Sequence, residues 1–434
     1  MKELLRYAKT AVLLLLMVLL LTGCGLKTVD QLYCLPKRSE TDNNLRTVID
    51  EAMDGLTFCA PTYGDNRQTV QAADLDGDEV DEYLVFATDN SDKPLKILIF
   101  CQLASGYVLM DTIEGYGFAF DFVEYAQLDD RPGVEIIVGR QVSDQVARAL
   151  SVYRFSSGFS RQLLSTGYSR LDSCDLNGDG INEIFLLNYG AAENGNGLVT
   201  LFSYRAGEMY RSAEQVLSLS ASHFERFTVG GLADGRPAMF VTFEKEDKSL
   251  LTDVFVMEDR ELLPVSKGNS TQLLQGYPVF PSDVDGDGVT DLARLLPIAG
   301  KGQTHSHHLL QWYSLDENGN EIEKRCTFHH YAEGWYLNVD KVSAAKIAVE
   351  QTEKETVFYM RSAGSYTELL RIRALTDTDR ESQAEKDDFM VLHKGNTVIY
   401  VAKLTEYAID QGITEEMLIS QFYPIRAELM KEED

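Results

Sequence analysis

The chain contains little cysteine, proline and tryptophan, and the shortage of cysteine excludes two kinds of protein module. Its 434 residues include 6 cysteines, 10 prolines and 2 tryptophans. No two cysteines form a Cys-x-x-Cys pair, so the sequence predicts neither a zinc module nor a disulfide framework. Beyond Cys24 an odd number remains, and we interpret these as buried thiols by default; a bridge between Cys34 and Cys59 stays open.

Positive charge is also scarce. The chain has 40 lysines and arginines against 68 aspartates and glutamates, which gives a formal net charge of −28 at pH 7. Such a charge repels nucleic acid and anionic lipid head groups and attracts cations. No nucleophile elbow, phosphate-binding P-loop or dinucleotide-binding glycine pattern occurs either. We therefore expect no nucleic-acid partner.

Long apolar runs are absent except near the N-terminus. Ala11 to Leu21 is apolar, follows three basic residues and leads into Leu21-Thr22-Gly23-Cys24. The run is too short for a comfortable membrane span and is typical of a signal peptide. The segment resembles the signal of bacterial lipoproteins, whose lipobox has this form. The resemblance implies cleavage before Cys24, a diacylglyceryl group on its sulfur, and a lipid-anchored protein on the extracytoplasmic face of the cell membrane; an ordinary secretory signal is the alternative.

Acids recur at short intervals in three nonamers, DLDGDEVDE, DLNGDGINE and DVDGDGVTD. Alternate acids around a glycine turn gather the oxygen ligands that Ca²⁺ prefers. An EF-hand would need a glutamate at the twelfth position, where Val85, Leu186 and Arg294 stand, so that loop type is excluded. We expect about three structural calcium ions, with metal-free acidic turns as the alternative. The predicted ligands are Asp74, Asp76, Asp78, the Val80 carbonyl and Glu82; Asp175, Asn177, Asp179, the Ile181 carbonyl and Glu183; and Asp283, Asp285, Asp287, the Val289 carbonyl and Asp291.

The nonamers belong to a repeat of about 50 residues, a period that indicates a propeller or a solenoid. Halfway between them lie two altered copies, QLDDRPGVE from Gln127 and GLADGRPA from Gly231. Each repeat is predicted to form four short strands, with the nonamer joining the first to the second. The expected fold class is therefore mainly β: a β-propeller of five four-stranded blades, with six left open, followed by a small α+β domain. Residues 56–63 are predicted to add a strand to the last blade.

The repeat region resembles the FG-GAP or VCBS-type calcium-binding repeats of bacterial surface proteins, which are related to the integrin α propeller. The acid positions of the three nonamers carry this resemblance, and it implies a calcium-binding propeller. In repeats two and four the acids are mostly lost, and Arg131 and Arg236 enter the loop. We expect these loops either to be metal-free or to be cross-linked by a guanidinium where the ion would lie.

The predicted organisation has four parts. These are a signal peptide at 1–23, a tether and short helix at 24–62, the propeller at 63–331 and the α+β domain at 332–434. Histidines also cluster late in the repeat region, near Cys326, and they offer ligands for Zn²⁺ or Cu²⁺. The residues of that cluster are His305, His307, His308, His329 and His330.

The function predicted from these features is that of a calcium-binding lipoprotein that acts as a binding or scaffold module. Its ligand, a protein or a glycan, is not specified by the sequence. Two alternatives are a propeller-based polysaccharide lyase or hydrolase, and a transition-metal-binding lipoprotein that uses the histidine cluster.

Overall fold

The computed structural model describes residues 40–142, 148–188, 195–259, 261–274, 276–301, 307–339, 344–385 and 389–425. The predicted signal peptide, Cys24, Cys34 and most of the predicted tether lie outside these residues. The described chain begins with helix α3 (Glu40–Ala52) and continues almost entirely as strands. None of the described helices is long and apolar enough to cross a membrane.

Four antiparallel sheets follow one another along the chain, and each contains a four-stranded meander; the first carries one extra strand, β1. This confirms the prediction of a mainly β fold of four-stranded units, which have the topology of propeller blades. The strands are β1 (Thr57–Phe58), β2 (Val70–Ala73), β3 (Glu82–Thr88), β4 (Leu95–Leu103) and β5 (Gly106–Gly115); β6 (Ala119–Ala126), β7 (Glu135–Gln141), β8 (Arg148–Ser156) and β9 (Phe159–Tyr168); β10 (Arg170–Cys174), β11 (Glu183–Asn188), β12 (Leu198–Arg205) and β13 (Glu208–Val216); and β14 (Phe224–Gly231), β15 (Pro237–Glu244), β16 (Leu250–Glu258) and β17 (Glu261–Thr271).

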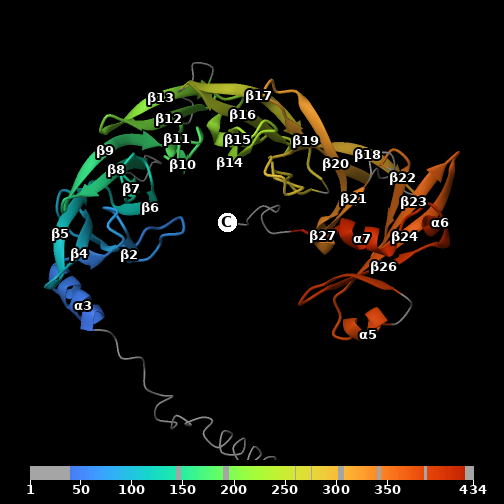
Figure 1. The fold of residues 1–434 in the computed structure, drawn as a ribbon, viewed down its shortest axis with the longest axis horizontal. Helices are drawn as coiled ribbons and strands as arrows, with labels where there is room; N and C mark the ends of the chain where they lie inside the picture. The colour runs from blue at the N-terminus through green and yellow to red at the C-terminus, as the bar shows by residue number, and fades with distance from the viewer. Residues whose placement is uncertain are drawn as a thin grey trace, which may run out of the picture.

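The sheets lie along an open arc (Figure 1). The first strand of each sheet lies toward the concave side and the fourth strand toward the convex side. The first sheet and the C-terminal strands stand at opposite ends of the arc. The predicted closure of the repeats into a ring is therefore not seen in this structure.

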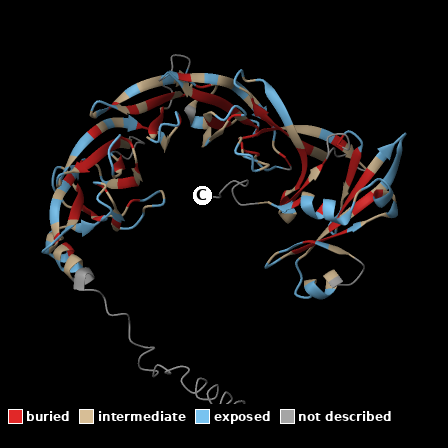
Figure 2. Ribbon diagram, viewed as in Figure 1, coloured by how far each residue is buried: buried red, intermediate tan, exposed pale blue. Residues whose placement is uncertain are grey.

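Strand alternation explains how the sheets stack. On β7, Ile136 belongs to the core shared with the first sheet, whereas the next residue, Ile137, belongs to the core shared with the third. On β15, Met239 packs with the third sheet and Phe240 packs with the fifth repeat. Because successive side chains point to opposite faces, a strand covered on both faces has an apolar residue at nearly every position. Figure 2 shows that the strands of these sheets are buried along much of their length.

Helix α3 covers the outer face of the first sheet. Its Ile49 is buried in one cluster with Val85 of β3 and Phe100 of β4, on the face opposite the second sheet. In a closed ring the last blade would pack here, so the helix acts as the terminal cap that an open stack of repeats requires. The prediction that residues 56–63 add a strand to the last blade is wrong, because Thr57–Phe58 pairs with Thr88 and Ala87 of the first sheet.

The fifth repeat merges with the C-terminal strands into one ten-stranded sheet. Its first strand is reduced to a bridge between Ser282 and Asp291. On one side β18 pairs with β19, and on the other it runs parallel to β22, where Ala299 lies opposite Ala348. Hydrogen-bonded strands thus cross the predicted boundary near residue 331, and a separate C-terminal domain stays a prediction. The remaining elements are η1 (Ala221–His223), β18 (Leu292–Gly300), β19 (His307–Leu315), β20 (Glu321–His330), η2 (Tyr331–Glu333), β21 (Trp335–Val339), β22 (Ile347–Gln351), β23 (Thr356–Ser362), β24 (Ser365–Leu375), α5 (Arg380–Glu385), β25 (Met390–Lys394), β26 (Ile399–Leu404), α6 (Glu406–Asp410), α7 (Glu415–Gln421) and β27 (Phe422–Pro424).

Candidate metal sites in the repeat loops

The loops between the first and second strands of repeats one, three and five share one turn, which differs in repeats two and four. We call the loops of the five repeats loop one (residues 74–82), loop two (127–135), loop three (175–183), loop four (231–238) and loop five (283–291). In loop five, Asp283 Oδ1 accepts the N–H of Gly286 at 2.7 Å and Oδ2 accepts that of Gly288 at 2.9 Å. Asp74 and Asp175 make the corresponding bonds in loops one and three. The leading aspartate therefore shapes the turn through backbone hydrogen bonds.

Two positions of this turn have left-handed backbone. In loop five they are Gly286, with φ +77°, and Gly288, with φ +83°. Glycine adopts such angles without a steric cost from a Cβ atom. Loop one departs from the pattern, because Glu79 stands at the second of these positions with φ 68°. A residue other than glycine is strained there.

The closing acid of each acidic loop is buried and ties the loop to the second strand. Glu82 Oε2 accepts the N–H of Leu75 at 3.0 Å, and Glu183 and Asp291 bind the second residue of their own loops in the same way. Burial is the main cause that raises the pKa of each of these three acids to about 7. In loop five, Oδ1 of Asp291 is buried and accepts no hydrogen bond from any described residue.

The structure brings the predicted ligands of loops one and five together. Carboxylate oxygens of Asp74, Asp76 and Asp78 lie within 4.8 Å of one another, and so do those of Asp283, Asp285 and Asp291. Six to eight oxygen ligands suit a hard cation such as Ca²⁺, so these donor sets fit the predicted ion. The orphaned oxygen of Asp291 fits it as well, because a buried carboxylate needs a positive partner. The Asp287 carboxylate lies beside the second group and accepts the N–H of Val289 at 2.9 Å.

Loop three differs in one ligand. Asn177 stands where the other two loops have an aspartate, and its Nδ2 donates to Glu183 Oε1 at 2.7 Å. In loop three the closing acid, Glu183, therefore has a hydrogen-bond donor from a side chain of its own loop. Asp175 and Asp179 keep the backbone bonds of the shared turn, including the bond from Ile181 to Asp179 at 2.9 Å. The metal-binding roles of the Val80, Ile181 and Val289 carbonyls stay predictions.

Loop two contains a cation that belongs to the protein. Arg154, on β8, is buried and pairs with Asp129 and, at 3.1 Å, with Glu135. Of the two expectations for loop two, the cross-link by Arg131 is wrong, because Arg131 is exposed, and the metal-free loop stays a prediction. Arg154 lies outside the nonamer and only strand pairing brings it to the loop. In loop four, Arg236 does pair with Asp234 of the same turn, at 2.6 Å.

Backbone hydrogen bonds connect neighbouring loops. Val134 in loop two donates to the carbonyl of Asp74 at 3.2 Å, and Asn182 in loop three donates to that of Gln127 at 2.7 Å. Thr290 in loop five donates to the carbonyl of Gly231 at 2.8 Å. A metal that orders one loop would therefore also order the edge of the next repeat.

Loop five is contacted by two basic side chains from β20. Lys324 Nζ is hydrogen-bonded to Asp287, and Arg325 Nη2 lies 3.1 Å from Asp285 Oδ2. Neither residue is part of the nonamer, and the sequence analysis did not single them out. The antiparallel pairing of β18, β19 and β20 carries them back to the loop.

The histidine cluster is not assembled as a metal site in the described part of the chain. The groups of three or more potential ligands found there are those of loops one and five, and neither contains a histidine. His329 is buried, its Nε2 lies 2.8 Å from Thr327 Oγ1, and burial lowers its pKa to about 3. His330 Nδ1 accepts the N–H of Glu333, whereas His305 lies outside the described residues. His307 and His308 lie on β19, and Cys326 is buried on β20.

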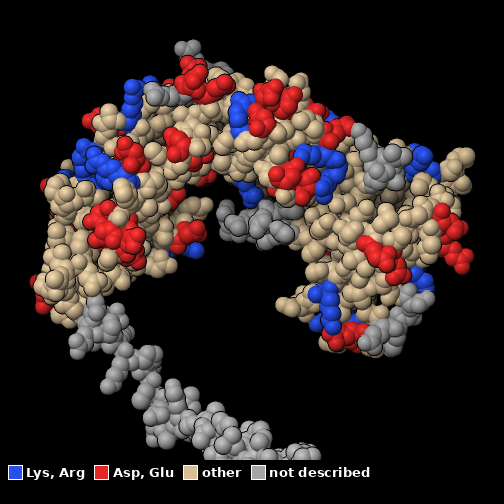
Figure 3. Space-filling model, viewed as in Figure 1, with Lys and Arg blue, Asp and Glu red and all other residues tan. Residues whose placement is uncertain are grey.

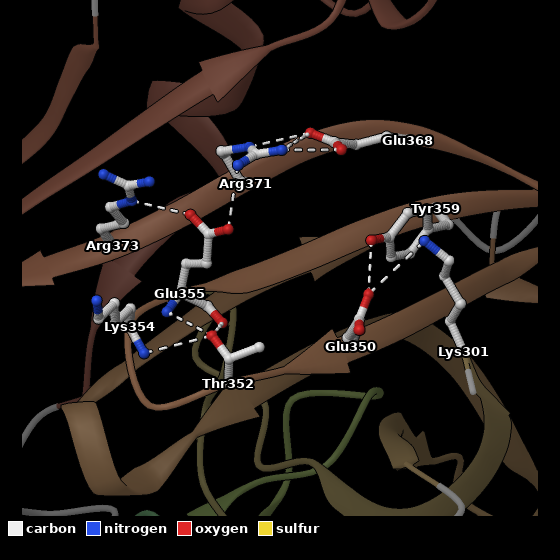
Figure 4. Close-up of polar contacts among 9 residues, drawn as sticks. All are labelled: Lys301, Glu350, Thr352, Lys354, Glu355, Tyr359, Glu368, Arg371 and Arg373. Carbon is white, nitrogen blue, oxygen red and sulfur yellow. Dashed lines mark hydrogen bonds and ion pairs between the residues drawn. The ribbon is translucent and has the colours of Figure 1, made fainter. Parts of the chain in front are cut away.

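Other charged groups on the surface form local ion pairs, although acids outnumber bases in the chain. On the face shown in Figure 3, acidic patches are scattered along the arc with basic groups between some of them. On the C-terminal strands, Glu355 bridges Arg371 at 3.1 Å and Arg373 at 2.9 Å (Figure 4). Nearby, Lys301 lies 3.8 Å from the centre of the Tyr359 ring, and the Tyr359 hydroxyl donates to Glu350. These contacts are those of an ion-pair network that supports the sheet.

One open hollow lies between repeats two and three and has polar groups in its lining. Its lining residues are Asp130, Arg131, Tyr204, Ala206 and Gly207, and its volume is about 300 Å³. A phenol and a guanidinium lie there away from the three acidic loops.

The repeat topology defines the chain as a mainly β protein built from propeller-type sheets. No protein-family model matches the chain, and no curated protein matches it. Solved structures that are similar to it include a rhamnogalacturonan lyase from Bacillus licheniformis, at 10% identity, a TM-score of 0.32 and coverage of 71% of this chain and 67% of that one. The rhamnogalacturonan lyase YesW has 12% identity and a TM-score of 0.33, with 73% and 63% covered. The Dos1 propeller has 11% identity and a TM-score of 0.30, with 67% and 62% covered.

The chain thus spans a little under two thirds of the YesW and Dos1 chains. Because identities and scores this low do not define a shared activity, function has to be inferred from the residues of this chain.

Proposed function

We propose that this protein is a calcium-stabilised module that binds or scaffolds a ligand at the cell surface, built on five repeats and anchored by lipid on Cys24. The observation that supports it most is in loop five, where Asp291 is fully buried, has an oxygen without a hydrogen-bond donor and lies against Asp283 and Asp285. Like charges held this close favour a cation among them. Loop one repeats the arrangement with Asp74, Asp76 and Asp78.

In this proposal the ion has a structural role. Calcium joins carboxylates that backbone hydrogen bonds already hold, so binding selects the folded loop over the dispersed chain. Each ion then adds RT ln(1 + [Ca²⁺]/Kd) to the free energy of unfolding, about 2.7 kcal/mol at a hundredfold excess over Kd. The bonds that join loops one to two, two to three, and four to five extend this order to the adjoining repeats, where a ligand would meet a rigid surface.

Calorimetric titration of the full chain in detergent tests the calcium role. We expect calcium uptake by loops one, three and five, and a melting temperature that falls when a chelator is added. Asp130→Asn is a matched control, because it removes one acid from the metal-free loop two. If no heat of binding is measured and a chelator does not change the melting temperature, the loops are acidic turns that bind no calcium.

The lipid anchor and the ligand need separate tests. Replacing Cys24 with alanine should release the protein from the membrane fraction or leave its signal uncleaved; a variant that is processed and stays in the acylated fraction contradicts the anchor. Glycan arrays and envelope extracts, probed with and without calcium, test for the ligand. If the ligand binds equally well with and without calcium, the ligand site does not depend on the calcium loops.

An enzyme remains the second candidate, and the hollow beside Arg131 is the observation that favours it. A polysaccharide lyase needs a group that removes a proton and a cation that stabilises the resulting charge. Tyr204 and Arg131 supply one of each. Tyr204→Phe and Arg131→Gln should abolish any depolymerisation of acidic polysaccharides. Activity that survives both substitutions excludes the hollow as an active site.

A further inference from the structure

Loop five carries both a complete set of acids and a set of protein cations. Lys324 is hydrogen-bonded to Asp287, and Arg325 pairs with Asp285 at 3.1 Å. The two basic groups therefore contact carboxylates that would also bind an ion.

These cations leave the centre of the loop unsatisfied. Asp291 is 0% exposed, and no described residue donates to its Oδ1. A carboxylate oxygen of Asp291 lies within 4.8 Å of those of Asp283 and Asp285, so the carboxyl group belongs to the same cluster. A buried carboxylate without a donor is costly, and the loop therefore keeps an unmet need for a cation at its buried side.

Loop two shows a different solution. There the Arg154 side chain is 7% exposed and its partners Asp129 and Glu135 are 0% and 2% exposed, so the cation is enclosed. In loop five the side chains of Lys324 and Arg325 are 19% and 29% exposed. Long basic side chains at a surface can exchange a carboxylate partner for water at little cost.

We propose that loop five is an exchange site, where a calcium ion competes with Lys324 and Arg325 for the same carboxylates. The inference rests on the proposed calcium role. When the ion enters, Asp285 and Asp287 bind it in place of the two basic side chains, which move into solvent. Loop five therefore fills at a higher calcium concentration than loop one, and its filling exposes a pair of positive charges on an otherwise acidic protein.

The two tryptophans give this loop its own signal. Trp312 lies in the same packed cluster as Val284 of loop five, and Trp335 lies on β21 beyond it. Loops one and three have no tryptophan in their sheets. Calcium titration of the full chain in detergent, followed by tryptophan fluorescence, therefore reports loop five while calorimetry reports all loops.

Lys324→Gln and Arg325→Gln should each lower the calcium concentration at half-change by about fivefold, which corresponds to about 1 kcal/mol for a partly exposed ion pair. Lys324→Arg keeps the charge and should titrate as the wild type does. Lys248→Gln is the charge control, because Lys248 pairs with Glu244 in a turn of another repeat. It should leave the midpoint unchanged.

Equal midpoints in the wild type and both glutamine variants would overturn the exchange. So would a fluorescence signal that does not respond to calcium in any variant while calorimetry records uptake by the other loops; the calcium proposal would then stand for those loops alone. If no form of the protein binds calcium, both proposals fail.

Discussion

Arg154 and Glu135 form a buried ion pair, with Nη1 and Oε1 3.1 Å apart, at the position of repeat two where repeats one and five hold clusters of carboxylates. Asp129 binds the same guanidinium and is fully buried. A side chain thus supplies in one repeat the positive charge that we propose calcium supplies in others.

Removing that guanidinium should be costly. Arg154→Gln leaves Asp129 and Glu135 buried without their partner, and breaking one side of a buried ion pair costs about 3–5 kcal/mol of the free energy of unfolding. Urea denaturation measures the loss. Arg211→Gln is the control, because Arg211 is exposed and pairs with Glu214 on the surface, and its change should stay within about 0.5 kcal/mol. Similar small effects of both substitutions would contradict the burial of the pair.

Asp74 and Asp76 should differ in what they contribute. Asp74 accepts three backbone N–H groups of its turn, so Asp74→Ala should lower the free energy of unfolding by about 2 kcal/mol even in chelator. Asp76→Asn copies Asn177 of loop three and should keep the shape of the turn. It should reduce only the part of the stability that calcium adds. Thermal melting of both variants, with calcium and with chelator, measures the two contributions. If Asp74→Ala and Asp76→Asn lose the same stability in chelator, the two residues do not differ in this way.

Calcium uptake near neutral pH should release protons. Burial first, and neighbouring acids after it, raise the pKa of Glu82 from 4.5 to about 7 in the folded protein. In chelator this acid therefore favours folding below about pH 4.5, and its contribution is lost as the pH rises through 7. Calcium favours the charged form and displaces the proton. Calorimetry at pH 7 in buffers of different ionisation enthalpy should show this release, and Glu82→Gln should reduce it; heats that do not depend on the buffer would count against it.

Glu79 should be replaceable with a gain in stability. It has φ 68°, where loops three and five have glycines at φ +85° and +83°. Glu79→Gly should raise the free energy of unfolding by about 1 kcal/mol in chelator. Glu79→Gln removes the same charge and keeps the strain, so it separates backbone relief from reduced repulsion. If glutamine stabilises as much as glycine does, the effect is electrostatic.

The helical cap on the first sheet should prevent association. Ile49→Glu places a charge against Val85 and Phe100 and should free α3 from the sheet, which exposes an apolar face. Light scattering should then detect self-association, with a loss of stability of about 2–5 kcal/mol. Glu51→Gln, on the exposed side of the helix, is the control. A monomeric Ile49→Glu variant of unchanged stability would mean that the helix does not cap the sheet.

Local sequence patterns were sufficient to predict the repeats and the turns. The nonamers specify their own shape, because Asp283 bonds to amides three and five residues ahead and glycines take the left-handed positions. Apolar runs such as that around Ile137 specify strands covered on both faces. The period of about 50 residues then follows from the spacing of the nonamers.

The sequence by itself determined the loops, their acids and the four-stranded units, since each depends on residues a few positions apart. Only the tertiary structure decided which cations meet these acids and how the stack ends. Arg154, Lys324 and Arg325 reach the loops across paired strands, and no local spacing records such a contact. The open arc follows from packing as well: α3 occupies the face that would close a ring, and β22 continues the last sheet through a parallel pairing with β18.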